Sequence, residues 1–492
     1  MSTRHSSSDD HLYSRRDLLR TLALGTAFLT LDGCSRLDRT LPNIILCMAD
    51  DLGWADTGYN GHPELLTPHL DAMSSEGIRF TRFYAAAPVC SPTRGSCLTG
   101  RHPYRYGIFN ANVGHLPHEE ATLAEILKSA GYTTGHFGKW HLGTLTETVL
   151  DSNRGGERGK DHYAPPWEHG FDVCFSTEAK VPTWDPMIKP SGETNKRWWN
   201  PVDRDGVSEP YGTRYWTGPD QAEDRNLEGD DSRIIMDRAT SFIRQASDRQ
   251  QPFFTVIWFH SPHWPVVAGS EYRRLYPDQD EFTRNHFGCI TAMDEQVGRL
   301  RNELEEAGVS GNTMLWFCSD NGPEGTVAEG NSHGAGSAGI LRGRKRSLYE
   351  GGVRVPGLLV WPDRIRGPHQ TDIPCCTSDY LPTIIDLLDL RPEEPAFPMD
   401  GISLAPLIKG RMQVRSHPIA FESGGQIALI DDRYKIISTD SGETFELYDL
   451  VDDPGESKDL AALEPTILET MVARLTEWRE SCRNSREGGD YE

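Results

Sequence analysis

The sequence predicts an α/β protein in which helices cover both faces of a large, mixed but mostly parallel β-sheet. A small subdomain built on an antiparallel sheet is expected to follow. Short apolar runs alternate with amphipathic helical patterns over most of the chain, and several short strands precede a final helix near the C-terminus. The 492 residues also exceed the roughly 250–300 residues at which a single core stops growing, so two unequal domains are expected.

Five short apolar runs predict buried strands, because each is continuous and is followed by a polar cluster. They span residues 43–48, 132–137, 253–259, 313–318 and 357–361. Helical patterns at 122–130, 232–246, 282–307 and 378–390 lie between or after them. This alternation predicts parallel strands covered by helices on both faces, in a first domain that spans residues 41–408.

Residues 144–231 depart from the alternation and are expected to form long surface loops, because Gly, Pro and charged residues are frequent there. The aromatic residues of such loops either pack onto the core or stack on sugar rings. They include Trp167, Trp184, Trp198, Trp199 and Trp216. Short strands at 419–422, 426–430, 434–438 and 445–450, followed by a helix from Pro465, predict a small C-terminal α+β subdomain over residues 414–492.

The overall charge limits the classes of partner. A formal net charge of −23 argues against general nucleic-acid binding and means that an anionic substrate needs a local cation or basic cluster. The ten cysteines show neither regular spacing nor CxxC pairs, so neither a disulfide framework nor a zinc ribbon is expected.

Residues 1–34 are expected to be an export signal. Arg15 and Arg16 precede an apolar run at 21–31 that is shorter than the about 20 residues of a membrane-spanning helix. The arginine pair is similar to a bacterial twin-arginine signal, and Leu-Asp-Gly-Cys at 31–34 is similar to a lipobox ending at Cys34. We therefore expect the twin-arginine machinery to export the protein, to the periplasm or to a lipid anchor at the cell envelope.

Polar residues of functional type follow four of the predicted strands. They are Asp50 and Asp51, Lys139 and His141, His260 and His263, and Asp320 and Asn321. An isolated Asp-Asp pair is more often a helix cap. Because ligands bind at the carboxyl ends of the strands in open parallel sheets, the four clusters together predict a single site.

The carboxylates of this predicted site indicate a metal ion. Asp50, Asp51 and Asp320 would repel one another if they converged without a cation. Together with Asn321 they offer only oxygen donors, which suit a hard cation and disfavour zinc. We prefer Ca²⁺ to Mg²⁺ because calcium tolerates irregular coordination of higher number.

A further motif carries a family resemblance. Cys90-Ser91-Pro92-Thr93-Arg94 is followed by Leu-Thr-Gly-Arg at 98–101. These residues resemble the C-x-P-x-R…L-T-G-R signature of type I sulfatases, members of the alkaline phosphatase superfamily, and the chain is similar to bacterial sulfatases of the arylsulfatase and N-acetylgalactosamine-6-sulfatase type. The resemblance runs from residue 43 to about residue 459. It implies an alkaline-phosphatase-like fold, sulfate ester hydrolysis, and oxidation of Cys90 to formylglycine by a formylglycine-generating or radical maturation enzyme.

The same resemblance implies a role for each matching position. The metal ligands fall on Asp50, Asp51, Asp320 and Asn321, completed by an oxygen of modified Cys90. The family motif Gly-Lys-Trp-His-Leu-Gly stands at 138–143, which places Lys139 on a sulfate oxygen and His141 on the second hydroxyl of the nucleophile.

Two further motifs match the family. His260 matches the histidine of an H-x-P motif and is expected to protonate the leaving alcohol. Lys345 lies five residues before Glu350, as in the K-x-x-x-x-E-G-G-x-R-V-P motif. Arg94, Lys139 and Lys345 are suited to neutralise a sulfate, and histidines to transfer protons near neutral pH.

Three assignments stay open. His263 is either a substrate contact or a core histidine with satisfied hydrogen bonds, and His333 is similarly ambiguous. Arg342, Arg344 and Arg346 flank Lys345 where the family more often has small residues, and Arg344 in particular is expected to steer polyanionic substrates. The alternative for this cluster is a solvated basic turn.

Two other functions compete with sulfate ester hydrolysis. One is a phosphodiesterase or phosphonate monoester hydrolase of the same superfamily. The other is a lipid-anchored protein that binds sulfated glycans without catalysis, against which the intact Cys90, Arg94, Lys139 and His141 argue. The expected substrate is a sulfated carbohydrate or an aryl sulfate, with specificity in the loops at 144–231.

Overall fold

The computed structural model describes residues 41–194, 198–200, 208–325, 336–390 and 397–491. Its main feature is a ten-stranded mixed sheet. In spatial order the strands are β14 (His369–Thr371), β2 (Ile78–Phe80), β13 (Gly357–Val360), β11 (Thr313–Ser319), β1 (Asn43–Ala49), β10 (Phe253–Trp258), β4 (Thr133–Lys139), β5 (Val173–Thr177), β8 (Tyr215–Gly218) and β9 (Gln221–Glu223). The five strands from β11 to β5 are parallel, so their carboxyl ends share one edge. The predicted export signal lies outside the described residues.

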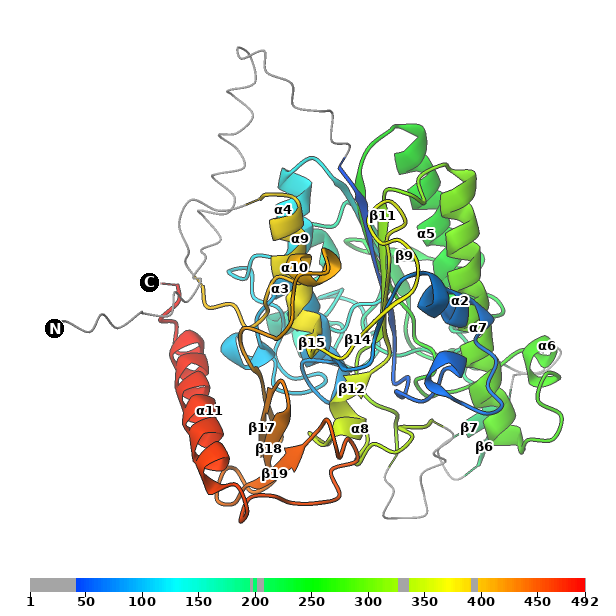
Figure 1. Cartoon of the computed structure of the whole chain (residues 1–492). Helices are drawn as coiled ribbons and strands as arrows, with labels where there is room; N and C mark the ends of the chain where they lie inside the picture. Colours follow the sequence, from blue (N-terminus) through cyan, green and yellow to red (C-terminus); the bar gives the residue numbers. More distant parts are fainter. Residues whose placement is uncertain (1–40, 195–197, 201–207, 326–335, 391–396, 492) are drawn as a thin grey trace, which may run out of the picture.

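Helices cover both faces of this sheet (Figure 1). One layer holds α2 (Pro68–Glu76), α5 (Asp231–Asp248) and α7 (Glu281–Glu306), and the other holds α3 (Cys90–Thr99), α4 (Leu123–Ser129), α9 (Tyr380–Leu387) and α10 (Ala405–Ile408). Side chains of β1 alternate between the two cores, with Ile44 and Leu46 on one side and Ile45 and Cys47 on the other. This two-sided burial explains why the central strands are continuous apolar runs.

Helix termini follow local sequence signals. The Thr122 side chain accepts a hydrogen bond from the Glu125 amide, and the Glu125 carboxylate accepts one from the Thr122 amide, which closes a capping box before α4. Asp280 caps α7 by accepting hydrogen bonds from the amides of Phe282 and Thr283. None of the helices in the described part of the chain is long and apolar enough to cross a membrane.

Two predictions about the sheet are wrong in part. The run at 357–361 was expected to be parallel, but β13 pairs antiparallel with β11. In the described residues between these strands the only helix is α8 (Glu350–Val353), which is too short to serve as the crossover helix that usually joins parallel strands. The region 144–231 is also not all loop, because β5, β8 and β9 extend the main sheet. Trp216 on β8 is buried and donates a hydrogen bond to Asp151, so it packs the core rather than facing a ligand.

The C-terminal residues form a separate antiparallel sheet, as expected from the sequence. It comprises β16 (Ile419–Ser423), β17 (Gln426–Asp431), β18 (Tyr434–Ser438) and β19 (Glu446–Asp449). Helix α11 (Pro465–Arg486) packs on one face through Met471 and Leu475. The other face packs against Leu348 and Val353, close in sequence to Lys345. The small sheet therefore supports the segment that carries Lys345.

The remaining described elements are short. They are α6 (Ser270–Arg273), a three-stranded sheet of β12 (Arg354–Val355), β3 (Phe83–Tyr84) and β15 (Cys375–Cys376), and a two-stranded sheet of β6 (Ser191–Thr194) and β7 (Trp198–Asn200).

Candidate active site

Acidic and amide side chains meet where β1 and β11 end. Asp50 and Asp51 directly follow β1, and Asp320 and Asn321 directly follow β11, its parallel neighbour. The Asp51 amide donates to Asp320 Oδ1 over 3.1 Å, and Asn321 Nδ2 donates to Asp51 Oδ1 over 2.7 Å. All four residues are buried. The shared edge of two parallel strands thus brings together the four residues that the sequence proposed as metal ligands.

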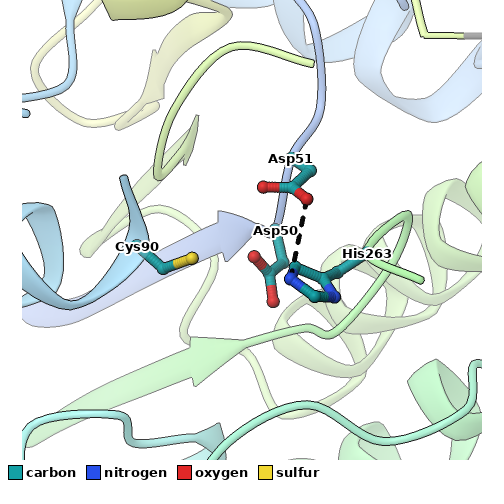
Figure 2. Close-up of side chains that lie close together, drawn as sticks. All are labelled: Asp50, Asp51, Cys90 and His263. Carbon is teal, nitrogen blue, oxygen red and sulfur yellow. Dashed lines mark ion pairs between the residues drawn. The ribbon is translucent and has the colours of Figure 1, made fainter. Parts of the chain in front are cut away.

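Cys90 points into this acidic centre from the first residue of α3. Figure 2 shows the sulfur of Cys90 directed toward Asp50, and Asp51 and His263 lie beside Asp50. Ligand atoms of these four residues lie within 4.8 Å of one another. Burial raises the pKa of the Cys90 thiol to about 11, although Lys139 and Lys345 oppose that shift. The unmodified thiol is therefore protonated, and a weak nucleophile, at neutral pH.

A basic group pairs with each carboxylate of the centre. Lys139 Nζ lies 2.6 Å from Asp50 Oδ2, and Lys345 Nζ lies 2.5 Å from Asp51 Oδ1. Arg94 Nη2 donates to Asp320 Oδ2 over 2.6 Å. These three basic side chains balance the charge of the three carboxylates. Repulsion among the carboxylates therefore does not by itself require a metal ion, contrary to the expectation from the sequence.

The donor set nevertheless fits a hard cation. Asp50 Oδ1 and Asn321 Oδ1 are buried and accept no hydrogen bond from the described residues. Asn321 uses its Nδ2 for Asp51, which leaves its Oδ1 for a cation. A buried oxygen without a hydrogen-bond partner destabilises the fold, and a bound ion would remove that destabilisation. A set of ligands that are all oxygens suits calcium or magnesium.

His141 enters the same pocket just beyond the end of β4 and has a left-handed backbone, with φ of 60°. Its Nε2 lies 3.0 Å from Asn112 Oδ1, which also accepts a hydrogen bond from Asn153 Nδ2 over 3.1 Å. An amide oxygen accepts hydrogen bonds, so Nε2 carries the proton and the buried Nδ1, which has no described partner, is the basic nitrogen. Burial and the charges of Lys139 and Arg94 lower the pKa of His141 well below its usual value.

His260 does not occupy the position that the sequence assigned to it. It is fully buried, its Nδ1 lies 2.8 Å from Asp231 Oδ2, and its Nε2 lies 2.7 Å from Thr177 Oγ1. Both ring nitrogens are engaged and His260 does not line the pocket, so it cannot reach a leaving alcohol there. The sequence could not show which histidine enters the pocket, because His260 and His263 both begin an H-x-P sequence.

His263 lies in the pocket instead. Its Nδ1 donates to the Trp264 carbonyl over 2.7 Å, and its Nε2 lies 3.7 Å from Asp51 Oδ2. The ring therefore turns Nε2 toward the acidic centre. Burial and the nearby lysines lower its pKa well below the usual value, so the ring is neutral in the free protein.

The arginines around Lys345 have separate environments. Arg344 Nη2 donates to the Glu324 carbonyl over 2.9 Å, and Arg344 does not line the pocket that holds Cys90. Its expected role in substrate steering stays a prediction. Arg342 lies over the Tyr349 ring, with its guanidinium carbon 3.7 Å from the ring centroid. Arg346 lines the pocket but forms a two-point ion pair with Glu324. His333 lies outside the described residues.

Sequence reasoning missed several pocket residues. Asn110, Asn112, Asn153, Lys180 and Trp264 all line the pocket with Cys90 and His141. Most of these residues lie in loops, which lack the hydrophobic periodicity from which the orientation of a side chain can be predicted. The dense amide cluster at 110–112 was the available signal, since asparagines in loops often serve binding.

Comparison with known proteins identifies the family of the chain. The family model described as Sulfatase matches residues 42–390, and one described as N-sulphoglucosamine sulphohydrolase, C-terminal, matches residues 343–481. The mouse N-acetylgalactosamine-6-sulfatase is 32% identical over 410 residues, which cover 79% of this chain and 70% of the relative. Bovine arylsulfatase A is 33% identical over 442 residues, which cover 87% and 80% of the two chains.

A solved structure agrees with these relatives. A Bacteroides thetaiotaomicron protein, described in work on the metabolism of multiple glycosaminoglycans, superposes with a TM-score of 0.69 at 26% identity. The match covers 90% of this chain and 99% of that protein.

Proposed function

The chain belongs to the sulfatase family and is a sulfuric ester hydrolase, and from this premise we propose that it acts on a sulfated carbohydrate through an oxidised Cys90 and a bound calcium ion. The observation that carries the proposal is the convergence of Cys90, Lys139, His141 and Lys345 on one pocket. The names of the relatives support the substrate class, because one acts on N-acetylgalactosamine 6-sulfate groups by its name.

Buried oxygens without a hydrogen-bond partner support a bound cation, although the side-chain charges of the centre balance without one. Three carboxylates face three basic groups, so a divalent cation held by Asp50, Asp51, Asp320 and Asn321 leaves the pocket with net positive charge. When bound, such a cation supplies an electrostatic attraction for sulfate oxygens and for charge that develops at sulfur. An acidic protein needs this local field to attract an anionic ester.

The proposed nucleophile comes from Cys90. A maturation enzyme oxidises the side chain to the aldehyde of formylglycine, and addition of water to that aldehyde gives a geminal diol. One hydroxyl attacks sulfur and displaces the alcohol, and the other then loses a proton so that the C–O bond to sulfate breaks and the aldehyde is restored. The high pKa of the buried thiol is consistent with a need for that conversion.

Each basic residue then acts on a stated atom. Lys139 and Lys345 lie at the bottom of the pocket and contact the sulfate oxygens, while Arg94 fixes the Asp320 carboxylate through two hydrogen bonds. His141 accepts a proton at Nδ1, because Asn112 holds the opposite tautomeric proton on Nε2. His263 turns Nε2 toward the leaving alcohol oxygen, since its Nδ1–H is committed to the Trp264 carbonyl. The ring is neutral in the free protein, so Nε2 first takes up a proton from solvent, which the negative charge of a bound sulfate ester favours, and then donates that proton to the alcohol oxygen.

His260 takes a different role in this proposal. Its hydrogen bonds to Asp231 and Thr177 join the start of α5 to the end of β5, so it stabilises the edge of the sheet on which the pocket is built.

We further propose export by the twin-arginine route after folding in the cytoplasm. The nine cysteines in the described part of the chain are all free thiols, which suits folding in a reducing compartment. Arg15 and Arg16 support that route.

Release of inorganic sulfate tests the proposed reaction. The wild type should hydrolyse 4-nitrophenyl sulfate and N-acetylgalactosamine 6-sulfate much faster than 4-nitrophenyl phosphate or a phosphonate monoester. The Cys90→Ala variant should bind metal and remain folded but show no turnover. Faster hydrolysis of the phosphorus esters would contradict the proposal and favour the phosphonate monoester hydrolase alternative.

A further inference from the structure

One basic side chain of the pocket, that of Lys180, forms no ion pair with any of the described residues. Lys139 pairs with Asp50, Lys345 with Asp51, and Arg346 with Glu324. Lys180 lines the same pocket, three residues after the end of β5, yet no carboxylate of the described residues lies within ion-pair distance of it. Its positive charge is therefore available to an anion that enters the pocket.

An aromatic ring positions this lysine. Lys180 Nζ lies 3.1 Å from the centroid of the Trp264 ring, and both side chains are half-buried. A cation–π contact holds an ammonium group in place but leaves its charge unneutralised, unlike an ion pair. Burial and repulsion from Lys139 and Lys345 lower the pKa of Lys180 to about 8, so an incoming anion would relieve an unfavourable charge cluster.

The position of Lys180 differs from that of the lysines assigned to the scissile sulfate. The side chains of Lys139 and Lys345 are 1% and 4% exposed, so both lie at the bottom of the pocket against the acidic centre. Lys180 and Trp264 are more exposed and so lie nearer the mouth. The part of a substrate that extends beyond its reacting sulfate must pass this mouth.

We propose that Lys180, held on Trp264, is a second anion subsite that binds a carboxylate or a further sulfate group on the same substrate. The proposal rests on the proposed function and narrows it, because the preferred substrate becomes a sulfate ester that carries a second negative group near the reacting one. Asn110, Asn112 and Asn153 line the pocket as well and offer neutral hydrogen-bonding groups for hydroxyls between the two anionic groups.

Two aryl esters that differ by one charge test this subsite. The probes are 4-nitrophenyl sulfate and 3-carboxy-4-nitrophenyl sulfate, assayed with the wild type, Lys180→Gln and Lys180→Arg. Lys409→Gln is the matched control, because Lys409 is an exposed lysine outside the pocket and its removal changes the net charge equally. Melting temperatures identify any variant that is misfolded.

The subsite predicts a selective effect. Lys180→Gln should raise KM for the carboxylated ester about tenfold and change KM for 4-nitrophenyl sulfate less than about twofold. Lys180→Arg should keep most of the preference, Lys409→Gln should keep all of it, and high salt should weaken it. An equal loss on both esters, or an unchanged preference in Lys180→Gln, would overturn the proposal.

A binding measurement separates this proposal from the proposed function. Calorimetry in a Cys90→Ala background reports the affinity for both esters without turnover. If the wild type failed to hydrolyse either ester, the proposed function would fail, whereas a preference for the carboxylated ester that depends on Lys180 would still support the subsite. Equal affinities with and without Lys180 would refute it.

Discussion

His263→Ala and His260→Ala are expected to have opposite effects, because only His263 lines the pocket. His260 is fully buried and uses both ring nitrogens, toward Asp231 and Thr177. Its removal leaves two buried polar groups short of a partner, at about 1–3 kcal/mol each, together with a cavity. We expect His260→Ala to lose about 3–5 kcal/mol of the free energy of unfolding, whereas His263→Ala loses one hydrogen bond, worth about 1 kcal/mol.

The catalytic effect should depend on the leaving group. A general acid contributes about 10²–10⁴-fold when the leaving alcohol is a poor one, as a sugar hydroxyl is. His263→Ala should therefore lower kcat about a hundredfold or more on N-acetylgalactosamine 6-sulfate, but much less on 4-nitrophenyl sulfate, whose phenolate leaves without protonation. Steady-state kinetics on both esters and thermal unfolding of both variants provide the assay. A stable His260→Ala with the same dependence on leaving group, beside a fully active His263→Ala, would refute the assignment.

Three further predictions concern the metal site, His141 and the export signal. Asp320→Ala should lose turnover and also the divalent cation, which elemental analysis measures. Its free energy of unfolding should fall by about 3–5 kcal/mol, because Arg94 is left buried without its partner. Full activity in metal-free protein would contradict this prediction. Asn112→Ala should lower kcat/KM about tenfold through the lost hydrogen bond to His141. Asn112→Asp should move the acidic limb of the pH profile to higher pH, because a carboxylate raises the pKa of His141, which must be neutral to accept a proton. An unshifted profile would argue against the contact between Asn112 and His141. Changing Arg15 and Arg16 together to lysine should leave the protein in the cytoplasm by cell fractionation, and unaltered export would show that another route is used.

The acidic centre could be predicted because the end of a buried strand is recognisable in the sequence, where an apolar run gives way to polar residues. Asp50 and Asp320 each close a continuous apolar run, and parallel neighbours bring such residues to one edge. Cys90 and Arg94 carried a motif, and the structure brings both to that edge. The strands of the C-terminal sheet and α11 were also predictable, because four short apolar runs separated by polar residues precede a helix that begins at Pro465.

What the sequence could not supply was direction in space. His260 and His263 fit the same short motif, and only the position of Asp231 at the start of α5 shows which ring turns inward. Lys180 and Asn112 lie in loops without periodicity, and their roles depend on partners distant along the chain. The direction of β13 likewise depends on a long connection rather than on its own residues.

The central claim is that hydrolysis depends on oxidised Cys90, and peptide mass spectrometry of active protein tests it most directly. Preparations with different extents of maturation should show turnover of 4-nitrophenyl sulfate in proportion to the fraction of the Cys90 peptide that carries an aldehyde in place of the thiol. Cys90→Ser, expressed and purified in the same way, provides the control for peptide recovery. Full turnover by protein whose Cys90 peptide is entirely unmodified cysteine would contradict the account.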